Sequence, residues 1–203
     1  MSTVSSRQPD VTRRRILDAA FREFFRNGFQ GGSLNRVVEG AGVTKGALFH
    51  HFAGKQELGY AVVDEVIGPL LLERWLGPLD GAADPVSAMQ RSFRRYAQED
   101  VKGGGYLNGC PLNNLAQEMS PLDEGFHARI HALYGLWRSS FAAALRRGAE
   151  AGTVRCDTSP ESAAALLVAL QMGIWGTGKS SRSAALMLEA AEAACEYLER
   201  LRP

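Results

Sequence analysis

The stretch 33–58, SLNRVVEGAGVTKGALFHHFAGKQEL, decides the fold of this chain. Its apolar residues Leu34, Val37 and Val38 recur at a spacing that places them on one face of a helix, and the serine before them can accept a hydrogen bond from a free N–H group of the first turn. Gly42 follows this helix, and glycine adopts without steric cost the positive φ that a tight turn requires. The pattern predicts two short helices joined by a turn of about three residues, and then the start of a third helix.

The second of these short helices has two different faces. Leu48 and Phe52 form its inward face, and Thr44 stands where a capping residue is expected. The outward face is small, polar and basic at its N-terminal end, and consists of Thr44, Lys45, Gly46, Ala47, Phe49 and His50. Such a face suits insertion into the major groove of DNA. Spacing alone also allows an ordinary helical hairpin with a solvated Lys45, because this geometry occurs in proteins that bind no DNA.

The residues themselves, beyond their spacing, resemble a known family. The run TRRRILDAAFREFFRNGF followed by SLNRVVEGAGVTKGALFHHFAGKQEL is similar to the N-terminal domain of the TetR family of bacterial transcriptional regulators. The similarity extends from Thr12 to about Val63, and AGVTKGALFHHF is close to the most recognisable run of the family. The rest of the chain fits the family in helix order and length only. The resemblance implies a DNA-binding head followed by a helical body that dimerises and binds small effectors.

The resemblance also implies a set of contacts to base edges and phosphates. Thr44 to Ala47 match the positions nearest base edges. Arg13 and Arg14, in the helix expected at 10–27, are added as phosphate contacts. Phe49 departs from the pattern, because the family usually has a tyrosine there whose hydroxyl reaches a phosphate; its ring is expected to touch a thymine methyl group or a sugar instead. The expected DNA-binding residues are Arg13, Arg14, Ser33, Arg36, Thr44, Lys45, Gly46, Ala47, Phe49, His50 and Lys55.

Composition narrows the classes of function. The chain has 203 residues, of which 45% are apolar, so it can form one domain or two small domains with a substantial core. Its net charge of +1 does not indicate a general binder of polyanions. The charge is uneven, since residues 1–58 hold 9 Lys and Arg against 5 Asp and Glu, whereas residues 59–203 hold 14 against 17. A basic N-terminal segment on a slightly acidic body suits a small DNA-reading head.

Cysteine and histidine usage gives no sign of a metal site or cofactor. Cys110, Cys156 and Cys195 are widely spaced, without the pairs that zinc sites use, and they suit a reducing cytosol. The neighbours His50 and His51 point about 100° apart on a helix and cannot chelate one ion together. The sequence lacks an apolar signal segment and any run of 18 apolar residues, so we expect a cytoplasmic protein without a membrane span. We also expect no cofactor.

Apolar periodicity predicts an all-α fold of about nine helices. We expect a disordered tail over 1–9, a helix-turn-helix DNA-binding domain over 10–54, and a ligand-binding and dimerisation domain over 55–203. Pro69 is expected to kink or interrupt a fourth helix over 55–75, since proline removes a ladder bond. Residues 178–183 are expected to form a loop. The other helices are expected at 10–27, 85–101, 111–120, 121–150, 159–176 and 184–201.

Aromatic residues and methionines recur in the predicted body. Composition alone indicates that these residues form a core, and the family resemblance implies that some of them line a ligand pocket. Polar residues within the set, and Gln171 in an apolar run, would orient a mostly apolar or aromatic ligand that is neutral, or cationic if Glu118 faces inward. The expected ligand-binding residues are Met89, Phe93, Tyr96, Asn113, Glu118, His131, Tyr134, Trp137, Met172 and Trp175.

Small residues form faces on the last two long helices, at Ala163, Ala164, Ala165, Ala169, Gly173 and Gly176. The resemblance implies that these helices build a four-helix homodimer interface, while close packing within one chain is the alternative. The combined prediction is a homodimeric repressor that reads an inverted-repeat operator and is released by a small effector.

Two alternatives stay open beside this combined prediction. One is a DNA-binding dimer with a filled core that acts without an effector. The other is a helical enzyme that would use Glu118, His127, His131 and Cys110. No nucleophile motif, phosphate loop or metal spacing supports an enzyme, so we do not expect one.

Overall fold

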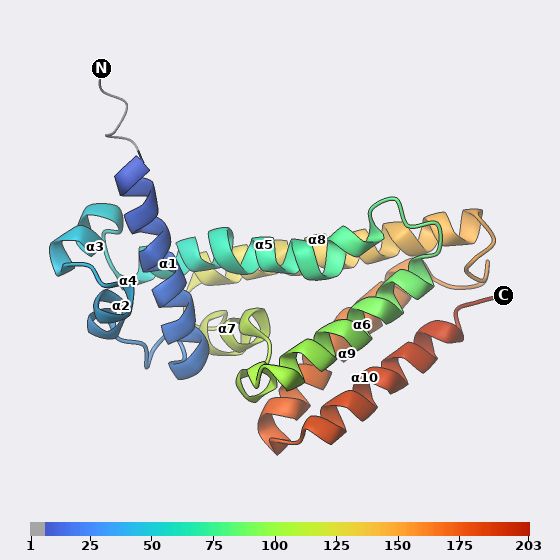
Figure 1. Cartoon of the computed structure of the whole chain (residues 1–203). Helices are drawn as coiled ribbons and strands as arrows, with labels where there is room; N and C mark the ends of the chain where they lie inside the picture. The colour runs from blue at the N-terminus through green and yellow to red at the C-terminus, as the bar shows by residue number, and fades with distance from the viewer. Residues whose placement is uncertain (1–6) are drawn as a thin grey trace. The chain divides into compact units, whose positions relative to one another are not determined.

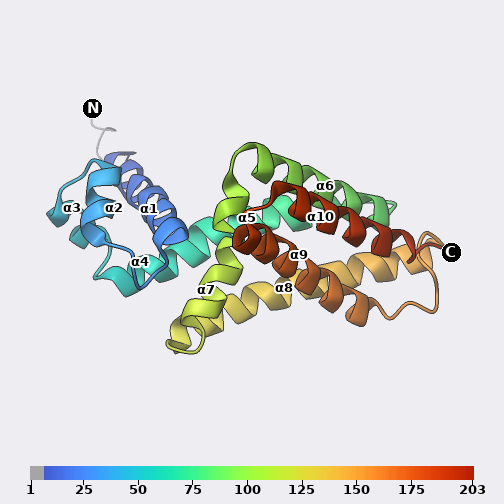
Figure 2. The same ribbon diagram turned by 90° about the horizontal axis from the view of Figure 1, so that it is seen from below.

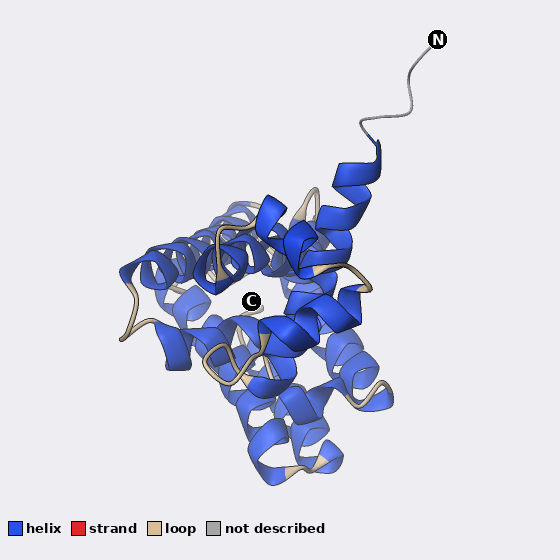
Figure 3. Ribbon diagram, turned by 90° about the vertical axis from the view of Figure 1, so that its left-hand side faces the viewer, coloured by secondary structure: helices blue, strands red, loops and turns tan. Residues whose placement is uncertain are grey.

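The computed structural model describes residues 7–203, and the disorder expected for residues 1–6 lies outside them. Every regular element in this range is helical, and Figure 3 shows no strand among the described residues. The all-α fold is therefore confirmed, with nine α-helices in this range when the run from α4 to η2 is counted as one. The chain divides into two compact units: one extends to Pro69 and includes Asn114–Ile130, and the other comprises Leu70–Asn113 and His131–Pro203.

The first unit contains the predicted helix-turn-helix. Its elements are α1 (Arg7–Asn27), α2 (Leu34–Ala41), α3 (Lys45–His51), α4 (Lys55–Val62) and the π-helix η1 (Val63–Ile67), drawn in blue to cyan in Figure 1. The start of α1 at Arg7 places residues 7–9 in a helix rather than in the expected tail. The core of this unit consists of apolar side chains that are at most 4% exposed, among them Ile16, Leu17, Phe24, Val37, Leu48, Phe52, Leu58 and Val62.

Local signals fix the turn between α2 and α3. Gly42 has φ 61° and ends α2, and its N–H group donates to the Glu39 carbonyl. The hydroxyl of Thr44 accepts a hydrogen bond from the Ala47 N–H group at 3.1 Å, so the cap predicted for α3 is confirmed. The prediction for Ser33 is wrong, because its hydroxyl makes no capping bond at the start of α2.

The segment Asn114–Ile130 belongs to the first unit because its side chains contact the head. The Phe126 ring lies 4.7 Å from the Phe29 ring and 4.9 Å from the Tyr60 ring, measured between centroids. The Asp123 carboxylate accepts a hydrogen bond from the Tyr60 hydroxyl at 2.7 Å. The expected domain boundary after residue 54 does not coincide with this division, since contacts between residues far apart in sequence carry no local signal.

Two π-turns follow α4 in the helical run. The Gly68 N–H group donates to the Val63 carbonyl, five residues back, and the short helix α5 (Gly68–Leu71) follows. The next π-helix, η2 (Leu72–Leu76), ends in the same way, with Gly77 bonded to the Leu72 carbonyl. Proline follows each of these glycines, in VDEVIGP (63–69) and LERWLGP (72–78). A proline lacks the N–H group and crowds the preceding turn, so the interruption expected at Pro69 takes the form of a wider turn.

The second unit is built around three long helices. α6 (Pro85–Lys102), α9 (Pro160–Ser181) and α10 (Ala184–Glu199) lie side by side in both Figure 1 and Figure 2. The 3-10 turns η3 (Gly77–Leu79) and η4 (Gly105–Asn108) precede α6 and α7. The helices α7 (Pro111–Met119) and α8 (Glu124–Glu150) contribute residues to both units.

Helix α9 begins as expected and ends later than expected. The Ser159 hydroxyl accepts a hydrogen bond from the Ser162 N–H group at 3.3 Å, which confirms the predicted start. The helix then continues to Ser181, so most of the loop expected over 178–183 is helical. Gly178 does not break the helix: a Cβ atom there would lie 3.0 Å from the Met187 sulfur, so the glycine permits a close approach of α10.

Candidate nucleic-acid interface and buried aromatic site

The outward face of α3 is exposed as the sequence predicts. Thr44, Lys45, Gly46, Phe49 and His50 are exposed, and Ala47 is partly buried. Phe49 is 48% exposed, so its ring is available to an outside partner on this face. A Cβ atom at Gly46 would meet only the Thr44 hydroxyl, at 3.9 Å, so packing within the chain does not require glycine there.

Arg13 and Arg36, expected at phosphates, are paired with carboxylates in the first unit. Arg13 forms a bidentate ion pair with Glu65 and lies over the Phe52 ring, 4.9 Å from its centroid. Arg36 Nε donates to Glu23 Oε1 at 2.7 Å. These ion pairs join α1 to η1 and to α2, and the phosphate contacts predicted for the two arginines stay predictions.

Glu23 is a structural residue of the head whose role the sequence does not reveal. It is only 8% exposed, and its Oε1 atom accepts hydrogen bonds from Arg36 and from the Ser33 N–H group at 2.9 Å. The hydrogen bond from Arg36 is the largest cause that holds the pKa of Glu23 below its ordinary value. This carboxylate thus pairs the N–H group of the residue before α2, and it leaves the N–H groups of the first turn of α2 without the capping bond expected from the Ser33 hydroxyl. On a helical wheel Glu23 resembles an ordinary solvated acid.

Two further residues of the predicted interface have partners in the first unit. Lys55 Nζ donates to the Gln30 carbonyl at 2.9 Å and lies 5.0 Å from the centroid of the Phe29 ring. Arg14 forms an exposed ion pair with Asp18 at 3.0 Å. Exposed pairs of this kind contribute little stability, on the order of 0–1 kcal/mol, so a phosphate can replace the carboxylate.

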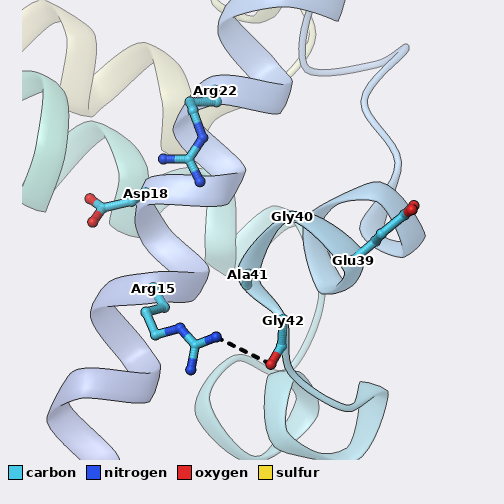
Figure 4. A pocket seen from close by; sticks show the side chains of 7 residues that line it. All are labelled: Arg15, Asp18, Arg22, Glu39, Gly40, Ala41 and Gly42. Carbon is cyan, nitrogen blue, oxygen red and sulfur yellow. Dashed lines mark hydrogen bonds between the residues drawn. The ribbon is translucent and has the colours of Figure 1, made fainter.

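An open groove separates α1 and α2. Figure 4 shows Arg15, Asp18 and Arg22 on one side, and Glu39 to Gly42 on the other. Arg15 Nη2 donates to the Gly42 carbonyl at 3.3 Å. The lining holds two arginines and two carboxylates, and Asp18 also forms the ion pair with Arg14.

An aromatic cluster fills the second unit. Trp75 lies at its centre, with ring centroids of Phe93 at 5.1 Å, Trp137 at 5.4 Å, Trp175 at 5.6 Å and Tyr96 at 5.7 Å. All five side chains are at most 5% exposed. They come from η2, α6, α8 and α9, which the sequence pattern could not assign to one place.

An ion pair is built into this cluster. Asp100 accepts hydrogen bonds from Arg74 at 3.1 Å and from the indole N–H group of Trp175 at 2.7 Å. The Arg74 guanidinium lies 4.9 Å from the centroid of the Tyr96 ring. Each charged group has its partner, so the pair adds no net charge to the cluster. The sequence analysis identified neither residue.

Three buried polar atoms of the second unit have no partner among the described residues. They are the Tyr134 hydroxyl, Trp137 Nε1 and Gln171 Oε1. Cys110 is also buried here, and burial raises the pKa of its thiol.

The structure brings some of the predicted ligand-binding residues together. Phe93, Tyr96, Trp137 and Trp175 lie in the aromatic cluster, with Met89 buried one turn before Phe93 on α6. Tyr134 has its hydroxyl buried. Asn113 and Met172 are partly buried, while His131 is exposed.

Glu118 has a different role from the one expected. Its two carboxylate oxygens accept hydrogen bonds from the Phe29 and Gln30 N–H groups, both at 2.8 Å. The carboxylate is therefore occupied by the turn after α1. The cationic ligand expected for an inward-facing Glu118 loses its support.

The small-residue faces of α9 divide between the interior and the surface. Ala163 and Ala164 are buried, whereas Ala165, Ala169 and Gly173 are exposed. A Cβ atom at Gly173 or Gly176 would meet no atom of residues 7–203 within 4 Å. Large apolar side chains are also exposed on α9, at Leu166, and on α10, at Leu186 and Leu188. This surface has room for another chain.

Neither a metal site nor a membrane span is found between residues 7 and 203. No group of three or more His, Cys, Asp or Glu side chains in that range could hold a metal ion. No helix there is both long and apolar enough to cross a membrane.

Comparison with family models gives two matches along the chain. Residues 16–62 match a model described as bacterial regulatory proteins of the tetR family. Residues 83–194, more than half of the chain, match a model described as the tetracyclin repressor-like C-terminal domain. The first match covers most of the helix-turn-helix unit, and the second covers the helices that carry most of the aromatic cluster.

Named relatives and solved structures agree with these matches. The transcriptional regulator AcuR of Cereibacter sphaeroides is 27% identical over 73% of this chain and 68% of its own length. The repressor DhaR of a Mycobacterium species is 26% identical over 79% of both chains. A TetR-family regulator from Agrobacterium tumefaciens has a TM-score of 0.84, at 19% identity, over 97% of this chain and 100% of that one. Another from Chloroflexus aurantiacus has a TM-score of 0.83, at 23% identity, over 96% and 97%.

Proposed function

The chain belongs to the TetR family of bacterial transcriptional regulators, and from this premise we propose that it is a homodimeric repressor that leaves its operator when a small effector binds the helical body. The observation that carries the proposal is the exposed face of α3, with Lys45, Gly46 and Phe49 pointing to solvent within the helix-turn-helix unit. A helix of this kind reads base edges in the major groove.

A homodimer is supported by the surface of α9 and α10. Glycine inside a helix costs roughly 0.5–1 kcal/mol relative to alanine, and no packing within the chain requires it at Gly173. The exposed Leu166, Leu186 and Leu188 add apolar area to the same two helices. A second copy of the chain would bury this surface. Two heads related by a two-fold axis would then read an inverted repeat with half-sites one helical turn, ~34–36 Å, apart or more.

An effector is supported by the unpaired buried polar atoms of the second unit. In a filled core that needs no ligand, buried polar atoms are expected to be hydrogen-bonded. Trp137 Nε1 and Gln171 Oε1 are buried without partners among the described residues. The effector releases DNA only if it binds the DNA-incompetent form better, and a tenfold loss of operator affinity requires about 1.4 kcal/mol of such preference. A DNA-binding dimer that responds to no small molecule is the second candidate.

DNA binding is tested with the DNA upstream of the coding sequence of this chain. Footprinting and gel shifts should reveal one inverted repeat, bound by two copies of the chain. Lys45→Ala should weaken specific binding by about 1–3 kcal/mol. Lys102→Ala is the matched control, because Lys102 is an exposed lysine on α6, outside the helix-turn-helix. Equal binding of all sequences at physiological salt would contradict the proposal.

The effector is tested separately, by thermal melting against a compound library. A compound present at 100 times its dissociation constant should stabilise the protein by about 2.7 kcal/mol. The same compound should release the operator in a gel shift. A protein that binds its operator but is stabilised and released by no compound would support the effector-free dimer.

A further inference from the structure

The three consecutive arginines of α1 point in different directions, because neighbouring residues of an α-helix are about 100° apart. Arg13 reaches η1, where the Glu65 carboxylate accepts two hydrogen bonds from it. Arg14 stays along α1 and pairs with Asp18 at 3.0 Å. Arg15 lines the groove between α1 and α2, and it alone of the three has no carboxylate partner among the described residues.

The bond that holds Arg15 leaves most of its hydrogen-bonding capacity unused. Its Nη2 atom donates to the Gly42 carbonyl at 3.3 Å, which is a long hydrogen bond to a neutral acceptor. A guanidinium has five N–H donors, and it binds a charged oxygen more strongly than a neutral one. A Cβ atom at position 42 would lie 2.7 Å from Nη2, so glycine there lets the guanidinium approach the turn. Arg15 is therefore held beside the turn while its other donors stay available to an anion.

The groove beside Arg15 has space for an anion and the charge to hold one. Its volume is about 400 Å³, and Arg22 lines it together with Arg15. Asp18 also lines it but is paired with Arg14. In Figure 4 the Glu39 carboxylate points away from Arg15. The positive charge of Arg15 is thus without a close counterion in the described part of the head, and this favours an anionic occupant.

The position of the groove within the helix-turn-helix indicates which anion binds. Gly42 ends α2 and stands two residues before Thr44, the cap of α3, whose outward face is exposed. In helix-turn-helix proteins the first residues of the second helix contact base edges, and the first helix crosses the DNA backbone. A groove that runs along α2 to this turn therefore lies where the phosphates of one strand pass.

We infer that Arg15 binds one backbone phosphate of the operator in this groove, beside the start of α3. The phosphate oxygens accept from the guanidinium N–H groups that the Gly42 carbonyl leaves unused. Arg22 lines the same groove but lies seven residues further along α1, about 10 Å at a rise of 1.5 Å per residue, and is remote from the turn. The inference rests on the proposed operator binding and adds a contact that the sequence analysis did not include.

The salt dependence of binding separates a phosphate contact from a structural role. Affinities for the operator and for a scrambled duplex of equal length are measured by fluorescence anisotropy between about 50 and 200 mM salt. Arg15→Gln should weaken both complexes alike, by about tenfold for each bound head, and should reduce the slope of log K against log salt by about 0.9 for each head. Arg22→Gln is the matched control and should bind as the wild type does. A merely structural role would lower the melting temperature and the preference for the operator without changing the slope.

A neutral backbone substitution then locates the phosphate. Methylphosphonate replaces the phosphates around each half-site one at a time, which removes the charge and keeps the bases. The wild type should lose affinity at several positions. Arg15→Gln should become insensitive at one of these positions and stay sensitive at the others, whereas Arg22→Gln should keep the wild-type pattern. Arg15 is exposed, so the variant should fold, and circular dichroism checks its helicity.

Two results would overturn the inference: Arg15→Gln keeps the wild-type slope and methylphosphonate pattern, or Arg22→Gln changes both as much as Arg15→Gln does. Either result, obtained with a protein that prefers its operator, leaves the proposed function intact. A protein that binds every duplex equally refutes the proposed function, while a slope reduced by Arg15→Gln alone still supports the phosphate contact. A protein that binds no duplex refutes both.

Discussion

The carboxylate of Glu118, on α7, accepts a hydrogen bond from the backbone N–H group of Phe29 at 2.8 Å and a second one from the N–H group of Gln30, also at 2.8 Å. Gly28 makes this approach possible. It has φ +75°, and a Cβ atom there would lie 3.1 Å from both carboxylate oxygens. The Glu118 side chain thus connects α7 by hydrogen bonds to the turn between α1 and α2.

We expect Glu118→Ala to lower the free energy of unfolding by about 1–3 kcal/mol, because two N–H groups at the turn lose a charged acceptor. Urea unfolding measures the change. Glu118→Gln should lose less, since the amide keeps one acceptor oxygen. The control is Gln117→Ala, an exposed neighbour on the same helix. Equal stability of the two alanine variants would show that the Glu118 contacts contribute nothing.

The stability of the head should fall in acid because of Glu23. The pKa of this carboxylate is held below its ordinary value of 4.5, mainly by Arg36, so its stabilising contribution is complete above that value. The contribution is lost as the pH falls through the lowered folded-state pKa. Glu23→Gln should therefore be less stable than the wild type at about pH 7, and the difference should narrow toward about pH 3.

Unfolding curves at several pH values measure this narrowing. Glu39→Gln serves as the control, because Glu39 is an exposed carboxylate on α2. A constant difference between Glu23→Gln and the wild type across the acid range would mean that the carboxylate does not titrate as described.

The elements predicted correctly are those whose signals are local. The turn at Gly42, the cap at Thr44 and the inward Leu48 lie within seven residues of one another, and each follows from the properties of one side chain. Proline and serine at the start of α9 act in the same local way. Local preference and final structure agree at these positions, so the fold class could be read directly.

The errors occur where a distant partner overrides a local preference. Gly178 favours a helix end in isolation, but Met187 packs against it and α9 continues. Glu118 reads as a ligand-binding acid, but its partners lie 88 and 89 residues away. Asp100 gives no signal at all until Arg74 and Trp175 are placed beside it. One sequence contains no record of such pairings.

Phe49 should read a thymine methyl group in the operator. Its ring is 48% exposed on the outward face of α3 and lacks a hydroxyl for a phosphate. Burying one methyl group contributes about 0.8 kcal/mol, so replacing the contacted thymine with uracil should weaken binding about fourfold. Each thymine of a half-site is replaced in turn, and affinity is measured by fluorescence anisotropy. Phe49→Ala should bind the thymine and uracil operators equally. If the wild type binds every uracil-substituted operator as tightly as the thymine operator, the Phe49 ring does not contact a thymine methyl group, and the prediction is wrong.

Gly173 and Gly178 should respond in opposite ways to added side chains. A Cβ atom at Gly173 would meet none of the described residues within 4 Å, so Gly173→Leu should leave the monomer fold intact and obstruct the approach of a second copy. Sedimentation should show loss of the dimer, with unchanged helicity and weaker operator binding. At Gly178 a Cβ atom would lie 3.0 Å from the Met187 sulfur, so Gly178→Ala should lower the melting temperature of the protein itself. A Gly173→Leu variant that remains dimeric would move the interface away from this face of α9.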